Sequence, residues 1–135
     1  MTALDIWQGH VELYRANREE SEEQTWERLA DWYDRWAHTN DYVDLHLPRL
    51  LRVLPKASRV LEIGPGTGAF TIPLAHVARE VVCLEPSASM RQALVRHLER
   101  ERLANVQVLP VRAEDGLAGL TADYDLALAS HSLYN

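Results

Sequence analysis

Three glycines within five positions, Gly64, Gly66 and Gly68, separate a short apolar run from an apolar helical pattern. Glycine adopts backbone conformations that other residues avoid, and it carries no Cβ to block an approaching group. A strand, a glycine loop and a helix in this order bring backbone N–H groups close to a nucleotide-like ligand. A turn without a ligand rarely uses so many glycines, so the sequence predicts a binding site at this loop.

Two carboxylates accompany the loop. Glu62 lies inside the preceding strand, two residues before Gly64, and Glu85 ends the next apolar run. A carboxylate at the end of a strand can accept hydrogen bonds from both hydroxyls of a ribose. Because Gly64-x-Gly66-x-x-Ala69 followed by an acid also fits the dinucleotide fingerprint, a nicotinamide-dependent oxidoreductase is an alternative interpretation.

Pro65 within the loop and the continuation Glu85-Pro86-Ser87 favour a different family. Residues 61–68 (LEIGPGTG) and 82–87 (VCLEPS) resemble motifs I and II of the class I S-adenosylmethionine-dependent methyltransferases. The resemblance extends over about residues 59–130. It implies a Rossmann-like fold, S-adenosyl-L-methionine as cofactor, and transfer of a methyl group to an acceptor.

The resemblance also implies which residues contact the cofactor. The loop backbone would approach the methionine portion, Glu62 would order its amino group, and Glu85 would bind the ribose. Residues after the second strand would line the adenine, and an acid after the third strand would accept from its amino group, although such acids also suit the start of a helix. The expected cofactor-binding residues are Glu62, Gly64, Pro65, Gly66, Gly68, Glu85, Pro86, Ser87, Met90, Ala113, Glu114, Asp115 and Ser130.

His131 and Tyr33 are the candidate catalytic residues. Residues 130–135 (SHSLYN) occupy the place of motif IV but lack the Asp/Asn-Pro-Pro-Tyr/Phe pattern of enzymes that act on DNA bases or amide nitrogens. His131 can act as a general base near neutral pH, or it can simply be a loop residue. Tyr33 belongs to a Trp-Tyr-Asp-Arg-Trp segment that resembles an element near the cofactor in related enzymes, and the charged residues around it, Glu27 included, indicate a solvated helix face.

The composition is ordinary for a globular protein, with 47% hydrophobic residues, but the net charge is −6. No basic face is implied, so a small-molecule acceptor is expected and nucleic acid is not. The chain shows neither a signal peptide nor a membrane-spanning run, which predicts a cytoplasmic protein. Cys83 is expected in the core. No metal is expected, because the other histidines lack metal-ligand spacing: His10, His38, His46, His76 and His97.

Helical and strand patterns alternate along the chain. Helices are expected over residues 2–17, 22–37, 42–54, 69–78 and 88–103. A capping box formed by Ser21 and Gln24 would begin the second of these helices. Asp41 would cap the third helix and Ser87 the fifth. Strands are expected over residues 60–63, 81–85, 106–111 and 124–129. This alternation predicts an α/β fold, a doubly wound parallel sheet of order 3-2-1-4 with the loop at the switch point. Residues 1–58 would be a helical cap and 59–135 a Rossmann-like half-domain, together one compact unit.

The family usually continues through about three more strands, so the sheet is expected to be truncated. Residues 124–129 would then be an apolar edge strand, which is a pairing hazard. We hypothesise a homodimer that joins two such edges. Truncation also keeps open a third interpretation, in which the chain is a non-catalytic S-adenosylmethionine-binding or interaction module.

Overall fold

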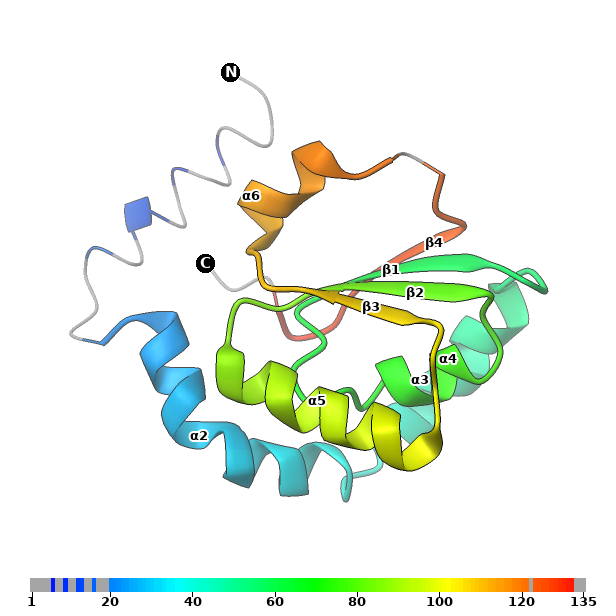
Figure 1. Cartoon of the computed structure of the whole chain (residues 1–135), viewed down its shortest axis with the longest axis horizontal. Coiled ribbons are helices and arrows are strands. Elements are labelled where there is room, and N and C mark those ends of the chain that lie inside the picture. Colours follow the sequence, from blue (N-terminus) through cyan, green and yellow to red (C-terminus); the bar gives the residue numbers. More distant parts are fainter. Residues whose placement is uncertain are drawn as a thin grey trace.

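The computed structural model describes residues 6, 9, 12, 13, 16, 20–121 and 123–132. Most of the helix predicted over residues 2–17 lies outside this set. Figure 1 shows a parallel sheet with helices on both faces. Its strands are β1 (Arg59–Ile63), β2 (Glu80–Leu84), β3 (Val106–Leu109) and β4 (Leu126–Ala129).

The strand order is β3-β2-β1-β4, with every pair parallel. The predicted Rossmann-like α/β fold and the order 3-2-1-4 are therefore confirmed. In the register, Leu61 of β1 lies between Val82 of β2 and Ala127 of β4. Because the sheet grows in opposite directions from β1, the loop that follows β1 lies at the switch point, where α/β sheets bind ligands.

The core lies mainly on one face of the sheet. There Val60, Val81 and Cys83 are buried against Leu74 of α4 (Thr71–Ala75), and α3 (Tyr42–Val53) adds partly buried apolar residues. Helix α5 (Ala88–Glu101) lies on this side too (Figure 1). The opposite face, where Val82 is buried, carries α6 (Ala113–Gly116) and the short 3-10 helix η1 (Leu117–Gly119).

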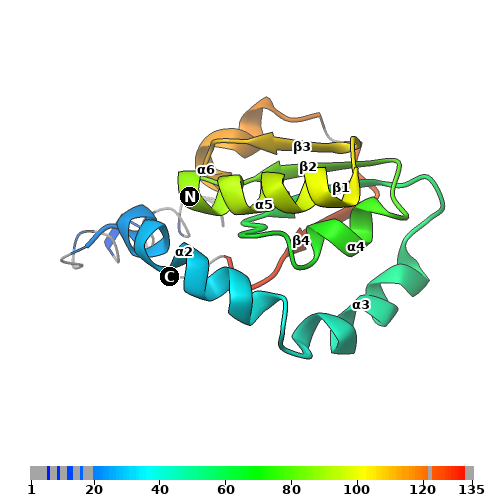
Figure 2. The ribbon, with the colours of Figure 1, turned by 60° about the horizontal axis from the view of Figure 1, so that its bottom comes forward.

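Helix α2 (Glu22–Ala37) begins with the predicted capping box. The Ser21 hydroxyl accepts from the Gln24 N–H at 3.2 Å, and the Gln24 side chain accepts from the Ser21 N–H at 2.9 Å. Helix α2 then packs against α5. Figure 2 shows these two helices from a second direction. The N-terminal region is thereby attached to the sheet unit.

Several local predictions are wrong. Strand β3 ends at Leu109 instead of residue 111, β4 begins at Leu126 instead of residue 124, and α4 begins at Thr71 instead of residue 69. Helix α4 ends at Ala75 instead of residue 78, because Asn105 Nδ2 donates to the carbonyls of Ala75 and Ala78 at 2.8 and 3.0 Å and supports a turn there. Asp41 makes no side-chain cap for α3; the side chain of Asn40 accepts from the Tyr42 N–H at 2.9 Å instead.

Among the described residues, the structure contains no helix that is both long enough and apolar enough to cross a lipid bilayer.

Candidate functional site

The loop after β1 takes a conformation that requires glycine. Gly66 has φ +58° and Gly68 has φ +96°, values that side chains rarely allow. A Cβ on Gly66 would lie 3.1 Å from the ring of Tyr33, and one on Gly68 would overlap the side chain of Leu94 on α5. The loop is therefore enclosed between α2 and α5, and its glycines permit this close packing.

Glu85 links this loop to the segment after β2. Its carboxylate accepts from the Gly66 N–H and from the Ser87 N–H, both at 2.9 Å, and the residue is buried. These two hydrogen bonds fix the orientation of the carboxylate. The side chain is thus preorganised at the carboxyl ends of β1 and β2.

Glu62 lies just before the loop and is buried. Thr71 on α4 donates its hydroxyl to the Glu62 carboxylate at 2.6 Å. Burial raises the pKa of Glu62 to about 7 against the effect of this hydrogen bond, and the Glu85 carboxylate adds to the rise. Near neutral pH this acid is therefore poised between its two protonation states, and a cation beside it would favour the ionised form.

The residues predicted to line the adenine lie at the same edge of the sheet. Ser87 and Met90 are buried at the start of α5, next to Pro86, which is partly buried. Ala113, Glu114 and Asp115 begin α6 after β3, one strand further along; Ala113 is buried, whereas Asp115 is exposed. Glu114 lies 3.8 Å from the guanidinium of Arg112.

Tyr33 lies over the glycine loop. Its ring meets Trp26 edge-on at 5.4 Å between centroids and lies 5.6 Å from the ring of Trp36. Together with its approach to Gly66, this packing gives Tyr33 a fixed position beside the candidate site.

Ser130 and His131 lie on the other side of the loop, after β4. His131 is exposed, has φ +52°, and packs its ring 4.9 Å from that of Tyr42. The Ser130 hydroxyl donates to the Tyr42 hydroxyl at 3.5 Å. The next residue, Ser132, lies so close to Gly64 (φ +64°) that a Cβ there would overlap it. The fold therefore brings this segment to the start of the glycine loop.

The site includes contacts that sequence reasoning missed. Glu27, interpreted as part of a solvated face, accepts from the Ser87 hydroxyl at 3.0 Å and from the Ser89 N–H at 3.2 Å, and it also bonds to the Ser89 hydroxyl. The Ser89 hydroxyl and the other donors hold the pKa of Glu27 below its usual range. Farther along α2, Asp34 bonds to His97 of α5. No local sequence pattern predicts these contacts, because the partners are 60 or more residues apart in the sequence.

Residues 60–135 match the model of a methyltransferase domain family. The chain belongs to this family. The match covers more than half of the chain. It confirms the family predicted from the two motifs, the class I S-adenosylmethionine-dependent methyltransferases.

Known relatives are similar over shorter stretches. A ribosomal RNA small subunit methyltransferase A from Desulforapulum autotrophicum is 47% identical over 51 residues, 38% of this chain. A 23S ribosomal RNA uracil methyltransferase from Xanthomonas euvesicatoria pv. vesicatoria is 36% identical over 80 residues, 59% of this chain. Each match spans 18% of the relative's own length. The crystal structure of a tRNA methyltransferase from Aquifex aeolicus is similar with a TM-score of 0.56 and 27% identity, over 65% of this chain and 36% of that one.

The prediction that excluded nucleic acid is wrong, because these relatives are ribosomal and transfer RNA methyltransferases. The inference came from the net charge of −6, which sums over the whole chain and does not describe any one surface. Helix α5 and its C-cap alone carry four arginines, at positions 91, 96, 100 and 102.

Proposed function

We propose that this chain binds S-adenosylmethionine at the carboxyl ends of β1 and β2 and is the cofactor-binding part of a methyltransferase. The observation that carries the proposal is the Glu85 carboxylate, held by the N–H groups of Gly66 and Ser87. It presents a fixed acceptor for a ribose at the switch point of the sheet, and an NAD-binding site would use an acid in a similar way. Membership of the methyltransferase domain family favours S-adenosylmethionine.

Each part of the site has a distinct role in this proposal. The backbone of the glycine loop lies against the amino-acid end of the cofactor and Glu62 orders its amino group. Glu85 holds the ribose, and the residues around Ser87 and Ala113 hold the adenine. Two carboxylates close together also favour a cationic ligand. Tyr33 closes the loop from the side of α2, which supports the proposed organisation of residues 1–58 as a helical cap on a half-domain of residues 59–135.

When bound, S-adenosylmethionine supplies an electrophilic methyl group. Displacement at this carbon depends mainly on how the acceptor and the cofactor are oriented, so the chain contributes positioning. A general base is required only for an acceptor that must lose a proton. His131 is the candidate for that role, because it follows β4 next to the start of the glycine loop.

For the acceptor we propose a nucleobase of RNA. The support comes from the relatives, two of which are ribosomal RNA methyltransferases. An RNA acceptor also agrees with the predicted cytoplasmic location. A small-molecule acceptor is the second candidate, and the aromatic side chains of Trp26, Tyr33 and Trp36 next to the loop favour it, since such rings can enclose a small apolar ligand.

Calorimetric titration with S-adenosylhomocysteine tests the cofactor site, with NAD as the competing ligand. Micromolar binding of S-adenosylhomocysteine is expected, and Glu85→Ala should weaken it by about 100-fold, because two hydrogen bonds to a charged group are lost. Glu99→Ala removes an exposed acid from α5 and serves as the matched control. Binding of NAD alone would support the oxidoreductase, and binding of neither ligand would support a non-catalytic interaction module.

Transfer of a tritiated methyl group from S-adenosylmethionine then tests the acceptor. Unmodified ribosomal RNA and a panel of small amines and phenols are offered in parallel. Label in the RNA, absent with Glu85→Ala, is the expected result. Label confined to a small molecule would replace the RNA proposal with the second candidate.

A further inference from the structure

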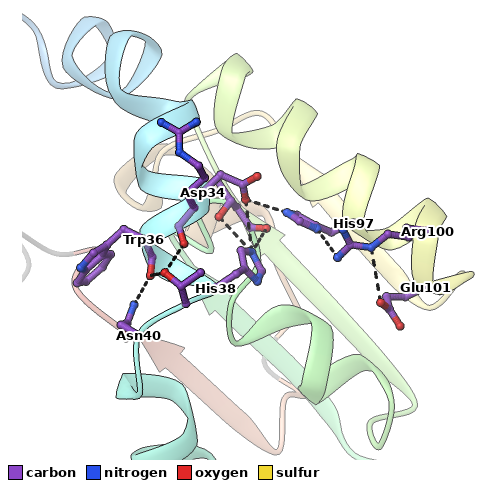
Figure 3. A network of polar contacts seen from close by, with 10 residues as sticks. Asp34, Trp36, His38, Asn40, His97, Arg100 and Glu101 are labelled. Atoms are coloured by element: carbon purple, nitrogen blue, oxygen red, sulfur yellow. Dashed lines mark hydrogen bonds and ion pairs between the residues drawn. The ribbon is translucent and has the colours of Figure 1, made fainter.

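Three side chains that can bind a metal converge where the end of α2 meets α5 (Figure 3). Asp34 lies on α2, His38 is the C-cap residue of that helix, and His97 lies on α5. Asp34 Oδ1 lies 2.8 Å from His97 Nε2 and 3.5 Å from His38 Nε2, and all three ligand atoms lie within 4.8 Å of one another. The two histidines are 59 residues apart, so their spacing along the sequence gave no sign of this cluster.

The donor set and its spacing suit a divalent transition metal. Imidazole nitrogen and carboxylate oxygen are ligands of Zn²⁺ at about 2.0–2.2 Å, which places two ligand atoms of a tetrahedral ion about 3.3 Å apart. The distances from Asp34 Oδ1 lie on either side of this value. We propose that Asp34, His38 and His97 form a binding site for a Zn²⁺-type ion. The remaining position would take water or an oxygen of Thr67, whose carbonyl and hydroxyl lie 3.3 and 3.4 Å from His38 Nε2.

His38 must change tautomer to bind a metal at Nε2. A carbonyl oxygen only accepts, so the contact at 3.3 Å between His38 Nε2 and the Thr67 carbonyl makes Nε2 a donor. The proton has to move to Nδ1 before Nε2 can bind the ion.

Arg100 sets the tautomer of His97 and thereby limits the metal affinity. A guanidinium has only donors, so the contact at 2.9 Å between Arg100 Nη2 and His97 Nδ1 makes Nδ1 an acceptor and leaves the proton on Nε2. A metal at Nε2 requires the proton to move to Nδ1, and Arg100 must then leave. Its side chain is 67% exposed and lies near Glu101 (3.7 Å), so Arg100 can move toward solvent.

The site would join the helical cap to the sheet unit. Two of its ligands belong to the end of α2 and the third to α5, while His38 also contacts Thr67 of the glycine loop. A bound ion would replace hydrogen bonds between these elements with shorter and stronger bonds. It should therefore raise the melting temperature of the whole chain.

Calorimetry with Zn²⁺, on the full chain without an affinity tag, tests the site, and Co²⁺ absorption reports its coordination. One ion per chain is expected, with an increase in melting temperature. His97→Ala should weaken binding at least tenfold, and so should Asp34→Asn; His76→Ala, which removes an exposed histidine elsewhere, should leave it unchanged. If His97→Ala does not fold, as judged by circular dichroism, His38→Ala takes its place, because that side chain is 28% exposed at the end of the helix.

Arg100→Gln separates a metal site from a cluster that merely forms hydrogen bonds. Removal of the guanidinium leaves Nδ1 able to hold the proton, so Zn²⁺ should bind several-fold more tightly, whereas a hydrogen-bonded cluster would only lose a contact. Binding that is unaffected by the His97, Asp34 and His38 substitutions would overturn the proposal, as would a lack of binding at millimolar Zn²⁺.

Discussion

At the scale of single residues, the buried carboxyl group of Glu62 lowers the stability of the fold when it is ionised, although the ionised form is the one proposed to bind the cofactor. In an unfolded chain its carboxyl group loses a proton near its ordinary pKa of 4.5, whereas the folded chain keeps that proton up to about pH 7. Between these values the folded chain binds more protons, so its free energy of unfolding falls as the pH rises. At pH 8 the buried charge costs roughly 3 kcal/mol.

Glu62→Gln should therefore stabilise the free chain at pH 8, where it removes the buried charge. The amide oxygen can still accept the hydrogen bond from Thr71. The gain should shrink as the pH falls from 7 and vanish below about 4.5, and urea unfolding across this range measures it. The same substitution should weaken S-adenosylhomocysteine binding, because it removes the carboxylate proposed to order the amino group of the ligand. A variant that is less stable than the natural chain at pH 8 would contradict the assignment of a buried, unfavourable charge.

Residues joined by local motifs could be predicted, and residues joined only by packing could not. The sequence predicts that Gly66 and Glu85 lie at the same edge of the sheet, because parallel neighbouring strands bring their carboxyl ends together. The hydrogen bond between these two residues was not predicted. The bond between Asp34 and His97 depends on where α2 lies against α5. Nothing in the local sequence fixes that placement. The same is true of Glu27, whose serine partners begin another helix.

At the scale of elements, the start of α5 depends on Ser87. Its hydroxyl accepts from the Met90 N–H at 3.3 Å and donates to Glu27 at 3.0 Å, so it caps α5 and ties α2 to it. Ser87→Ala should lower the free energy of unfolding by about 1–2 kcal/mol, measured by urea titration. Ser89→Ala is the matched control, because it removes a hydroxyl contact to Glu27 and leaves the cap in place. Equal losses in the two variants would show that the cap itself contributes little.

Element types could be predicted more securely than element ends. The capping box of α2 could be predicted because Ser21 and Gln24 are only three residues apart in the sequence. The early end of α4 was missed because it depends on Asn105, which reaches back across the fold to Ala75. The carbonyl oxygens in the last turn of a helix accept from any suitable donor nearby, and only the tertiary structure decides which donor that is.

At the scale of the whole molecule, the sheet order was predictable because short right-handed crossovers leave few arrangements for alternating strands and helices. The position of α2 against the glycine loop was expected only from family resemblance. In the structure it arises from contacts that include the ring of Tyr33 against Gly66 and His38 against Thr67. These contacts support the proposal that the cap and the half-domain form one compact unit.

The proposed homodimer also belongs to this scale. Within the described residues, β4 pairs with β1 on one side only. Leu126 and Leu128 are half-buried, whereas Ala127 and Ala129 are exposed, so the edge presents backbone groups and small side chains that a second copy can approach.

The molar mass measured by light scattering over a range of micromolar concentrations should approach twice the chain mass of 15.4 kDa. Ala127→Lys should keep the chain monomeric, because a charge on an edge strand opposes pairing. Ala104→Lys, which adds the same charge at an exposed turn, should leave the dimer intact. A monomer at every concentration would refute edge pairing, and a dimer unaffected by Ala127→Lys would place the interface elsewhere.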